Sequence, residues 1–287
     1  MFYLTGYAPR TMLSRFFQIT VYIFAIIGFL FVAMYFAVKY GLTNTTGIID
    51  TQRESFLVGA AGAAPPSDVS ADLPWSQTEE WGVLDASIRK DAPAINRAAG
   101  DAGVPARLIV ANLVAEQLRL FFTEREAYKQ FFFPLKILGS QTQFSWGVMG
   151  MKEDTAIDVE AHLADPASPF YPGAAYAHLL DFPATTTDMK QARFVRMTDE
   201  QDHYWSYLYA GLYLKEIETQ WTNAGHSIND NPGVLSTLFN IGFAHSNPNP
   251  APQVGGAEIG VNGTSYSFGG LAADFYNSNL LTDVFPR

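Results

Sequence analysis

The chain has 287 residues, with 18 lysines and arginines, 28 aspartates and glutamates, and no cysteine. Without cysteine, disulfide bonds and cysteine-based metal sites or catalysis are excluded. Three of the basic residues and none of the acidic ones fall in the first 39 positions, so the remainder has 15 basic and 28 acidic side chains, a formal charge of −13. Phosphate contacts need clustered Lys and Arg, so we expect no nucleic-acid partner.

The N-terminal part contains a long hydrophobic segment. Residues 16–38 form an uncharged run of 23 residues between Arg15 and Lys39. As a helix it would extend about 34 Å, which is enough to cross a hydrocarbon core of about 30 Å. It is longer than the apolar region of a cleavable signal peptide and too apolar on every side for an ordinary core helix. We therefore expect a single transmembrane helix. Arg10 and Arg15 precede it, which places residues 1–15 in the cytoplasm and the rest of the chain outside.

The remainder divides by composition into a linker and one domain. Residues 39–73 are rich in Gly, Ala, Ser, Thr and Pro and predict a flexible linker. Residues 74–287 have the length and apolar content of a single domain. Their periodicity predicts a mainly α fold. The expected helices cover 76–90, 92–100, 104–122, 155–165, 198–221, 232–244 and 267–285, with a short strand at 265–268. The fifth of these helices would begin with a capping box, Thr198-x-x-Gln201.

One acidic residue interrupts an apolar helix. Glu116 lies in the run Leu108–Phe122, and at helical spacing it faces the interior. The residues that share its face are Ile109, Leu113 and Leu120. An unpaired carboxylate buried there would favour its protonated form. Alternatively, the side chain reaches solvent or pairs with Arg107 or Arg119.

Three further segments follow in order: SWGVMGMKEDTA at 145–156, GLYLKEI at 211–217 and LFNIGF at 238–243. Together with Glu116 they resemble the lytic transglycosylase branch of the lysozyme-like superfamily, the soluble lytic transglycosylase and goose-type lysozyme family. There, a glutamate in a Glu-Ser or Glu-Gln pair is followed by Gly-Leu-Met-Gln-Ile-Met-Pro-x-Thr-Ala, then Tyr-Leu, then Ala-Tyr-Asn-Ala-Gly. The resemblance implies a lysozyme-like α-helical domain that cleaves peptidoglycan.

The resemblance also assigns roles to individual residues. It makes Glu116 the catalytic residue. The positions that it assigns to substrate binding are Ser145, Gly147, Met149, Tyr213, Phe239 and Asn240. Each has a plainer reading: Ser145 and Asn240 as caps, Gly147 for close backbone approach, Met149 as core filling, and Tyr213 and Phe239 as packing residues.

The chain departs from the family pattern in three places. Gly150 stands where the family has glutamine, and Phe239 stands where it has tyrosine. Glu116 and Gly147 are 31 positions apart, which is longer than the family's usual spacing. These departures concern activity more than fold.

The resemblance implies a mechanism with one acid. Glycosidic cleavage needs a proton donor, and ordinary hydrolases add a second carboxylate. The family dispenses with the second one, because the same glutamate accepts the proton of the sugar's 6-hydroxyl and a 1,6-anhydro end forms. The carboxylates near these motifs, which we interpret as surface charges, are Glu124, Glu126, Glu153 and Asp154. The alternatives are a hydrolytic muramidase on the same fold and an inactive wall-binding scaffold.

The remaining expectations concern cofactors and partners. The histidines, His162, His178, His203, His226 and His245, show no metal-ligand spacing, so we expect no metal site and no cofactor. The expected partners are peptidoglycan glycan strands, the membrane through the N-terminal helix, and a protein complex of the cell envelope. The domain would lie on the extracytoplasmic side of the cell membrane.

Overall fold

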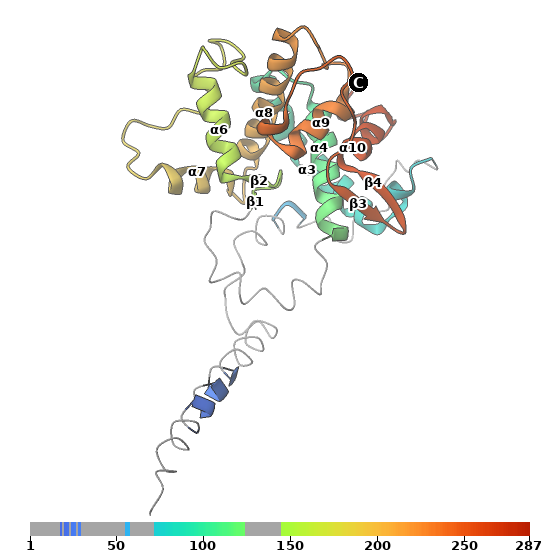
Figure 1. Cartoon of the computed structure of the whole chain (residues 1–287). Helices are drawn as coiled ribbons and strands as arrows, with labels where there is room; N and C mark the ends of the chain where they lie inside the picture. Colours follow the sequence, from blue (N-terminus) through green and yellow to red (C-terminus); the bar gives the residue numbers. More distant parts are fainter. Residues whose placement is uncertain are drawn as a thin grey trace, which may run out of the picture. The chain divides into compact units, whose positions relative to one another are not determined.

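The computed structural model describes residues 72–123 and 145–287, three residues at 55–57, and residues 18, 20–22, 24–26, 28 and 29 (Figure 1). Of these described residues, those before position 30 belong to one compact unit and those from position 55 on belong to a second, so the two are considered separately. Glu124 and Glu126 lie outside the described residues.

The described residues of the first unit are helical and fall within the predicted membrane span, 16–38. Their large apolar side chains expose between 51% and 72% of their surface; these are Val21, Tyr22, Phe24, Ile26 and Phe29. Among the residues that the structure describes, no helix combines the length and the apolar character required to cross a membrane. Most of the predicted span lies outside those residues.

The second unit is mainly helical, which confirms the fold class at this level. Its helices are α3 (Glu79–Ala102), α4 (Ala106–Thr123), α6 (Glu153–Ala164), α7 (Met189–Met197), α8 (Tyr204–Asn223), α9 (Pro232–Ile241) and α10 (Phe268–Asn277), with short 3₁₀ helices η1 (Pro74–Gln77) and η3 (Phe243–His245). Two antiparallel hairpins complete it, β1 (Ser145–Trp146) with β2 (Met151–Lys152), and β3 (Glu258–Val261) with β4 (Thr264–Ser267).

The core lies where α4 meets its neighbours. Helix α3 packs against α4 and α8, and α10 packs against α4 and α9 (Figure 1). Gly211 of α8 allows a close approach to α3 and α4, because an added Cβ would lie 2.8 Å from Ala102 Cβ and 3.2 Å from Ile109 Cδ1. The largest buried apolar side chains of this core include Trp75, Trp81, Trp221, Tyr207, Tyr209, Phe268, Phe275 and Phe285. Helix α4, which carries Glu116, is therefore enclosed by other helices.

Helix α3 is one continuous helix, whereas the sequence predicted two. It runs through Pro93, which lacks the N–H that an interior position normally donates. The helix continues because residues on both sides of Pro93, among them Ile88 and Ile95, are fully buried in the same core. It ends at Gly103 rather than at Gly100. Gly103 has a φ of 64°, and its N–H reaches the carbonyls of the last turn.

The predicted capping box at the start of α8 is wrong. The helix begins at Tyr204, after His203, and Thr198 instead closes α7, a helix that was not predicted. The intervening turn is held by Asp199, whose Oδ1 accepts the Gln201 N–H at 2.8 Å. The hydrogen bond to Asp199 thus stabilises a turn at the positions where the sequence predicted the first turn of α8.

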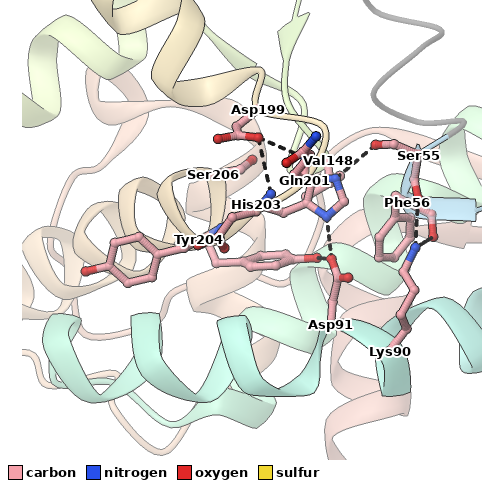
Figure 2. Close-up of polar contacts among 12 residues, drawn as sticks. Ser55, Phe56, Lys90, Asp91, Val148, Asp199, Gln201, His203, Tyr204 and Ser206 are labelled. Carbon is pink, nitrogen blue, oxygen red and sulfur yellow. Dashed lines mark hydrogen bonds and ion pairs between the residues drawn. The ribbon is translucent and has the colours of Figure 1, made fainter.

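Three residues from the predicted linker, 39–73, pack on the domain. Phe56 is fully buried, and its ring meets the His203 ring edge-on with 5.9 Å between centroids. Lys90 Nζ donates to the carbonyls of Ser55 at 2.7 Å and Phe56 at 2.8 Å (Figure 2). The segment Ser55–Leu57 is thus attached to α3 and to the start of α8.

A single buried arginine joins α4 to the end of the chain. Arg107 is fully buried, and its guanidinium donates to five backbone carbonyls at 2.8–3.0 Å. The acceptors are Phe275, Tyr276, Ser278, Leu280 and Phe285. All five donors of the side chain are used. Burial and the charge of Arg287 lower the pKa of Arg107 to about 10, so the group stays charged at neutral pH.

We expect Arg107→Met to lower the free energy of unfolding by about 3–5 kcal/mol. The substitution keeps the length of the side chain but leaves buried carbonyls without a donor. Denaturant unfolding of the full chain measures the loss. Arg97→Met is the control, because the Arg97–Asp202 pair is half exposed, and it should cost less than about 1 kcal/mol. Equal losses in the two variants would contradict this role for Arg107.

Candidate functional site

The motif at 145–156 folds as a hairpin followed by the start of α6. Strands β1 and β2 pair Ser145 with Lys152 and Trp146 with Met151. In the connecting loop the Gly150 N–H donates to Gly147 O at 3.2 Å. Both glycines have positive φ, 67° at Gly147 and 62° at Gly150, a region that side chains disfavour. The turn therefore accounts for the two glycines of the motif.

Two helices hold this loop in place. Gln117 of α4 is buried, and its Nε2 donates to Val148 O at 2.6 Å. Ser206 Oγ of α8 accepts the Met149 N–H at 3.3 Å. Gly147 lies against α8 and the end of α7, because an added Cβ would overlap Ser206 Oγ of α8 and lie 2.6 Å from Met197 O of α7. Nothing in our sequence analysis pointed to Gln117 and Ser206 as anchors of the loop.

The loop lies directly on the carboxyl group of Glu116. An added Cβ at Gly150 would overlap Glu116 Oε1 and lie 2.8 Å from its Cδ. The backbone of the loop at Gly150 occupies the space beside the acid. Glycine is the residue that both this contact and the positive φ allow.

Glu116 is buried, as its position on the helix face predicted, but it is not unpaired. The residue is 4% exposed. Arg119, one helical turn along α4, donates from Nη2 to Oε1 at 2.6 Å and from Nε to Oε2 at 3.1 Å. The expectation of a carboxylate in purely apolar surroundings is therefore wrong, and pairing with Arg119 was the alternative. Arg107, the other candidate partner, binds the C-terminal carbonyls instead.

A pocket of about 340 Å³ opens beside this ion pair. Its described lining residues come from α4, the β1–β2 hairpin, α6, α8, the end of α9 and the loop before β3; they are Glu116, Arg119, Met149, Gly150, Met151, Lys152, Thr155, Tyr213, Phe239, Asn240, Ile241, Gly242 and Ala257. Five residues predicted from separate motifs thus meet at one pocket. Gly147 contacts α8 instead, and the side chain of Ser145 lies outside what the structure describes.

Aromatic packing and one amide shape the α8–α9 side of the pocket. The rings of Tyr213 and Phe239 pack with centroids 5.2 Å apart. The Tyr213 hydroxyl donates to Leu238 O at 3.5 Å, and burial raises the pKa of Tyr213 well above its usual value, so the hydroxyl keeps its proton. Asn240 Oδ1 accepts the Ala257 N–H at 2.8 Å. Asn240 therefore fixes the loop before β3 against the end of α9.

Glu116 is the only carboxylate among the described residues that line the pocket. Asp154 is exposed, in agreement with its interpretation as a surface charge. Glu153 is not: it is buried and pairs with Lys190 at 3.3 Å and with Arg193 at 3.9 Å. The interpretation of Glu153 as a solvated charge is wrong, because cations from α7 cover it.

A second buried acid lies on α8. Glu216 is fully buried, and among the described residues neither of its carboxylate oxygens has a hydrogen-bond partner. Burial, with a smaller effect from the negative charge of Asp158, raises the pKa of Glu216 well above its usual value. A carboxyl group in such a place is protonated at neutral pH. We did not predict this buried acid, because the segment at 211–217 was interpreted only for its Tyr213-Leu214 pair.

A hydroxyl, an imidazole and a carboxylate line up at the docked segment (Figure 2). Ser55 Oγ lies 3.1 Å from His203 Nε2, and His203 Nδ1 lies 2.5 Å from Asp91 Oδ2. These spacings match a nucleophile–base–acid series. However, the His203 side chain is 6% exposed, and Tyr207 donates to the same oxygen of Asp91 at 2.7 Å. With Phe56 buried beside it, the series attaches the segment to the domain.

Within the described ranges, no group of three or more histidine, cysteine, aspartate or glutamate side chains is placed to hold a metal ion. Comparison of the chain with protein-family models, with curated proteins and with solved structures found no match.

We expect Gly150→Ala to destabilise the domain more than Gly225→Ala does. Both glycines have positive φ, but no atom lies within 4 Å of a Cβ added at Gly225, whereas one at Gly150 meets the Glu116 carboxyl. The control thus measures backbone strain alone, and the crowding at Gly150 should add about 1–3 kcal/mol. Thermal and denaturant unfolding measure both variants. Equal destabilisation would mean that the hairpin moves away from Glu116 without cost.

We expect Glu216→Gln to alter how stability depends on pH. In the wild type, the folded state keeps the proton of Glu216 at pH values above 4.5, the usual pKa of a glutamate, whereas the unfolded state loses it there. This group therefore makes the protein less stable as pH rises above that value, by about 1.4 kcal/mol per pH unit. Glutamine does not ionise, so the variant does not lose stability in this way. Its stability relative to wild type should therefore increase from pH 5 to pH 7. A difference independent of pH would show that Glu216 is ionised in the fold.

Proposed function

We propose that the protein cleaves the glycosidic bond between MurNAc and GlcNAc in peptidoglycan, as an enzyme of the lytic transglycosylase type on a lysozyme-like fold. Glu116 is the acid and base of the reaction. Met149, Tyr213, Phe239 and Asn240 line the sugar site, and Ser145 and Gly147 belong to the hairpin that borders it.

One observation supports this proposal above the others. Four motifs that are far apart in the sequence meet at a single pocket, in which a buried carboxylate lies on the wall. The volume of about 340 Å³ is within the range of small-molecule sites. A chance combination of packing residues gives no reason for Met149, Phe239 and Asn240 to surround the same acid.

The proposed reaction uses one carboxyl group twice. Glu116, in its protonated form, gives its proton to the glycosidic oxygen as the bond from the sugar C1 to that oxygen breaks. The sugar's 6-hydroxyl oxygen then bonds to C1, and its proton passes to Glu116. The acid is restored, a 1,6-anhydro end forms, and no water is consumed. The lack of another carboxylate among the described lining residues favours this route over hydrolysis.

Two alternatives remain in different classes. A hydrolytic muramidase on the same fold would release reducing ends, and it would need a group that activates water. An inactive wall-binding scaffold is favoured by the replacement of the family's tyrosine by Phe239, since its ring supplies no hydroxyl beside Glu116. The products of the reaction separate these possibilities.

The proposed enzyme is anchored in the membrane and acts on its outer side. The described residues within 16–38 are helical and expose apolar side chains, which suits a lipid environment. The charge bias of Arg10 and Arg15 favours a cytoplasmic N-terminus. The domain would then act on glycan strands near the membrane, within or beside a protein complex of the cell envelope.

We expect Glu116→Gln to reduce cleavage of purified peptidoglycan by about 10²–10⁴-fold, the usual contribution of a positioned acid. Glutamine keeps the size of the side chain and can still bond to Arg119, so the fold should be retained. The assay is release of soluble fragments, with mass spectrometry of their ends. Asp154→Asn is the control, because Asp154 is exposed on α6, and it should retain wild-type activity.

The products decide between the routes. Fragments ending in 1,6-anhydro sugar support the proposal, whereas reducing ends identify a hydrolase. Equal cleavage by wild type and Glu116→Gln would remove Glu116 from the mechanism. If the wild type binds peptidoglycan without cleaving it, the scaffold is the correct alternative.

A further inference from the structure

The ion pair between Glu116 and Arg119 at the pocket wall conflicts with the proposed role of Glu116 as a proton donor. A proton donor must be protonated before the reaction starts, but a guanidinium that bonds to both oxygens of a carboxylate favours its ionised form. Arg119 makes both of these bonds to Glu116, at 2.6 and 3.1 Å. The pair is largely shielded from water, since the Glu116 side chain is 6% exposed and that of Arg119 is 24% exposed.

Arg119 also borders the space that a ligand would occupy. It lines the pocket together with Glu116, so a saccharide oxygen that approaches the carboxyl must compete with the guanidinium for the same atoms. Gly150 closes another side of the carboxyl, where no further side chain fits. Within the described part of the pocket, a ligand that contacts the Glu116 carboxyl therefore lies close to the Arg119 guanidinium.

We infer that Arg119 is a positioning residue that keeps Glu116 ionised and oriented until substrate displaces its guanidinium. The inference rests on the proposed function for its catalytic meaning, but the control of the charge of Glu116 by Arg119 is independent of it. Release of Arg119 removes the charge that favours ionisation, and Glu116 then takes up the proton that it later donates. The site is thereby activated by the ligand that fills it.

The other charged and titratable groups around Glu116 set the size of the expected effect. Among the described pocket residues, these are Lys152 at the end of the hairpin and Tyr213 of α8. Tyr213 is neutral, because burial raises its pKa. The described lining residues of α9 and of the loop before β3 carry no charge. Among the described residues that line the pocket, Lys152 is the cation that remains when Arg119 is replaced, and Lys152→Gln is the matched control.

The first test measures the charge of Glu116 without any assay of activity. The full chain, labelled with ¹³C at the glutamate carboxyl carbons and kept in detergent micelles, is titrated by NMR, and the Glu116 signal is assigned by its absence in Glu116→Gln. In Arg119→Gln the midpoint of this signal should move to higher pH by about one to three units. Arg119→Lys keeps the charge and should move it less, as should Lys152→Gln. An unchanged midpoint in Arg119→Gln overturns the inference.

The second test uses the dependence of peptidoglycan cleavage on pH. The basic limb of kcat/KM follows loss of the proton from the acid of the free enzyme. In Arg119→Gln this limb should move to higher pH by the same amount as the NMR midpoint. Superimposed profiles for wild type and Arg119→Gln would overturn the inference. If no variant cleaves peptidoglycan, the proposed function fails, while the titration still decides the role of Arg119.

Discussion

The fold depends on a buried positive charge that is solvated by backbone carbonyl groups instead of water. Arg107 is fully buried, and its five donors all reach carbonyls at the C-terminal end of the chain. Such a group is costly unless every donor is satisfied, so it specifies one arrangement of these turns and excludes others. Arg107 lies in the first turn of α4, the helix that carries Glu116. The position of the acid is thus linked to residues more than 150 positions away, which no local pattern encodes.

The interior holds several carboxyl groups, and each is accommodated by different physical means. Glu116 is paired with an arginine from its own helix. Glu153 is paired with cations from a neighbouring helix. Glu216 has no such partner among the described residues, and burial makes its neutral form the stable one. Of these three, Glu116 borders the pocket. Burial alone would therefore not single out the proposed catalytic acid, because Glu116 and Glu216 are both buried and differ in their partners and in their place relative to the pocket.

Much of the fold could be predicted, and the failures have physical causes. Helix α4 follows from local periodicity, whereas the β1–β2 hairpin was not predicted, although positive φ at Gly147 and Gly150 explains the two glycines of its loop. The continuity of α3 through Pro93 was not predictable, because burial of residues far apart in the chain outweighs the local penalty. Among the site residues, Met149 and Asn240 were found through motif order. Gln117 was missed, because its anchoring contact joins positions 31 apart and leaves no sequence periodicity.

If the proposed membrane anchor is correct, the docked segment Ser55–Leu57 limits the distance between the bilayer and the domain. In the proposed topology, 16 positions (39–54) separate the anchor from the docked segment, whereas 35 positions (39–73) separate it from the start of the predicted domain. Fully extended, these lengths correspond to about 55 Å and about 120 Å. Attachment of these three residues to the domain therefore halves the greatest possible distance between the proposed anchor and the domain. The proposed enzyme would then reach only the wall strands nearest the membrane, whereas attachment at position 74 would give access to strands farther away.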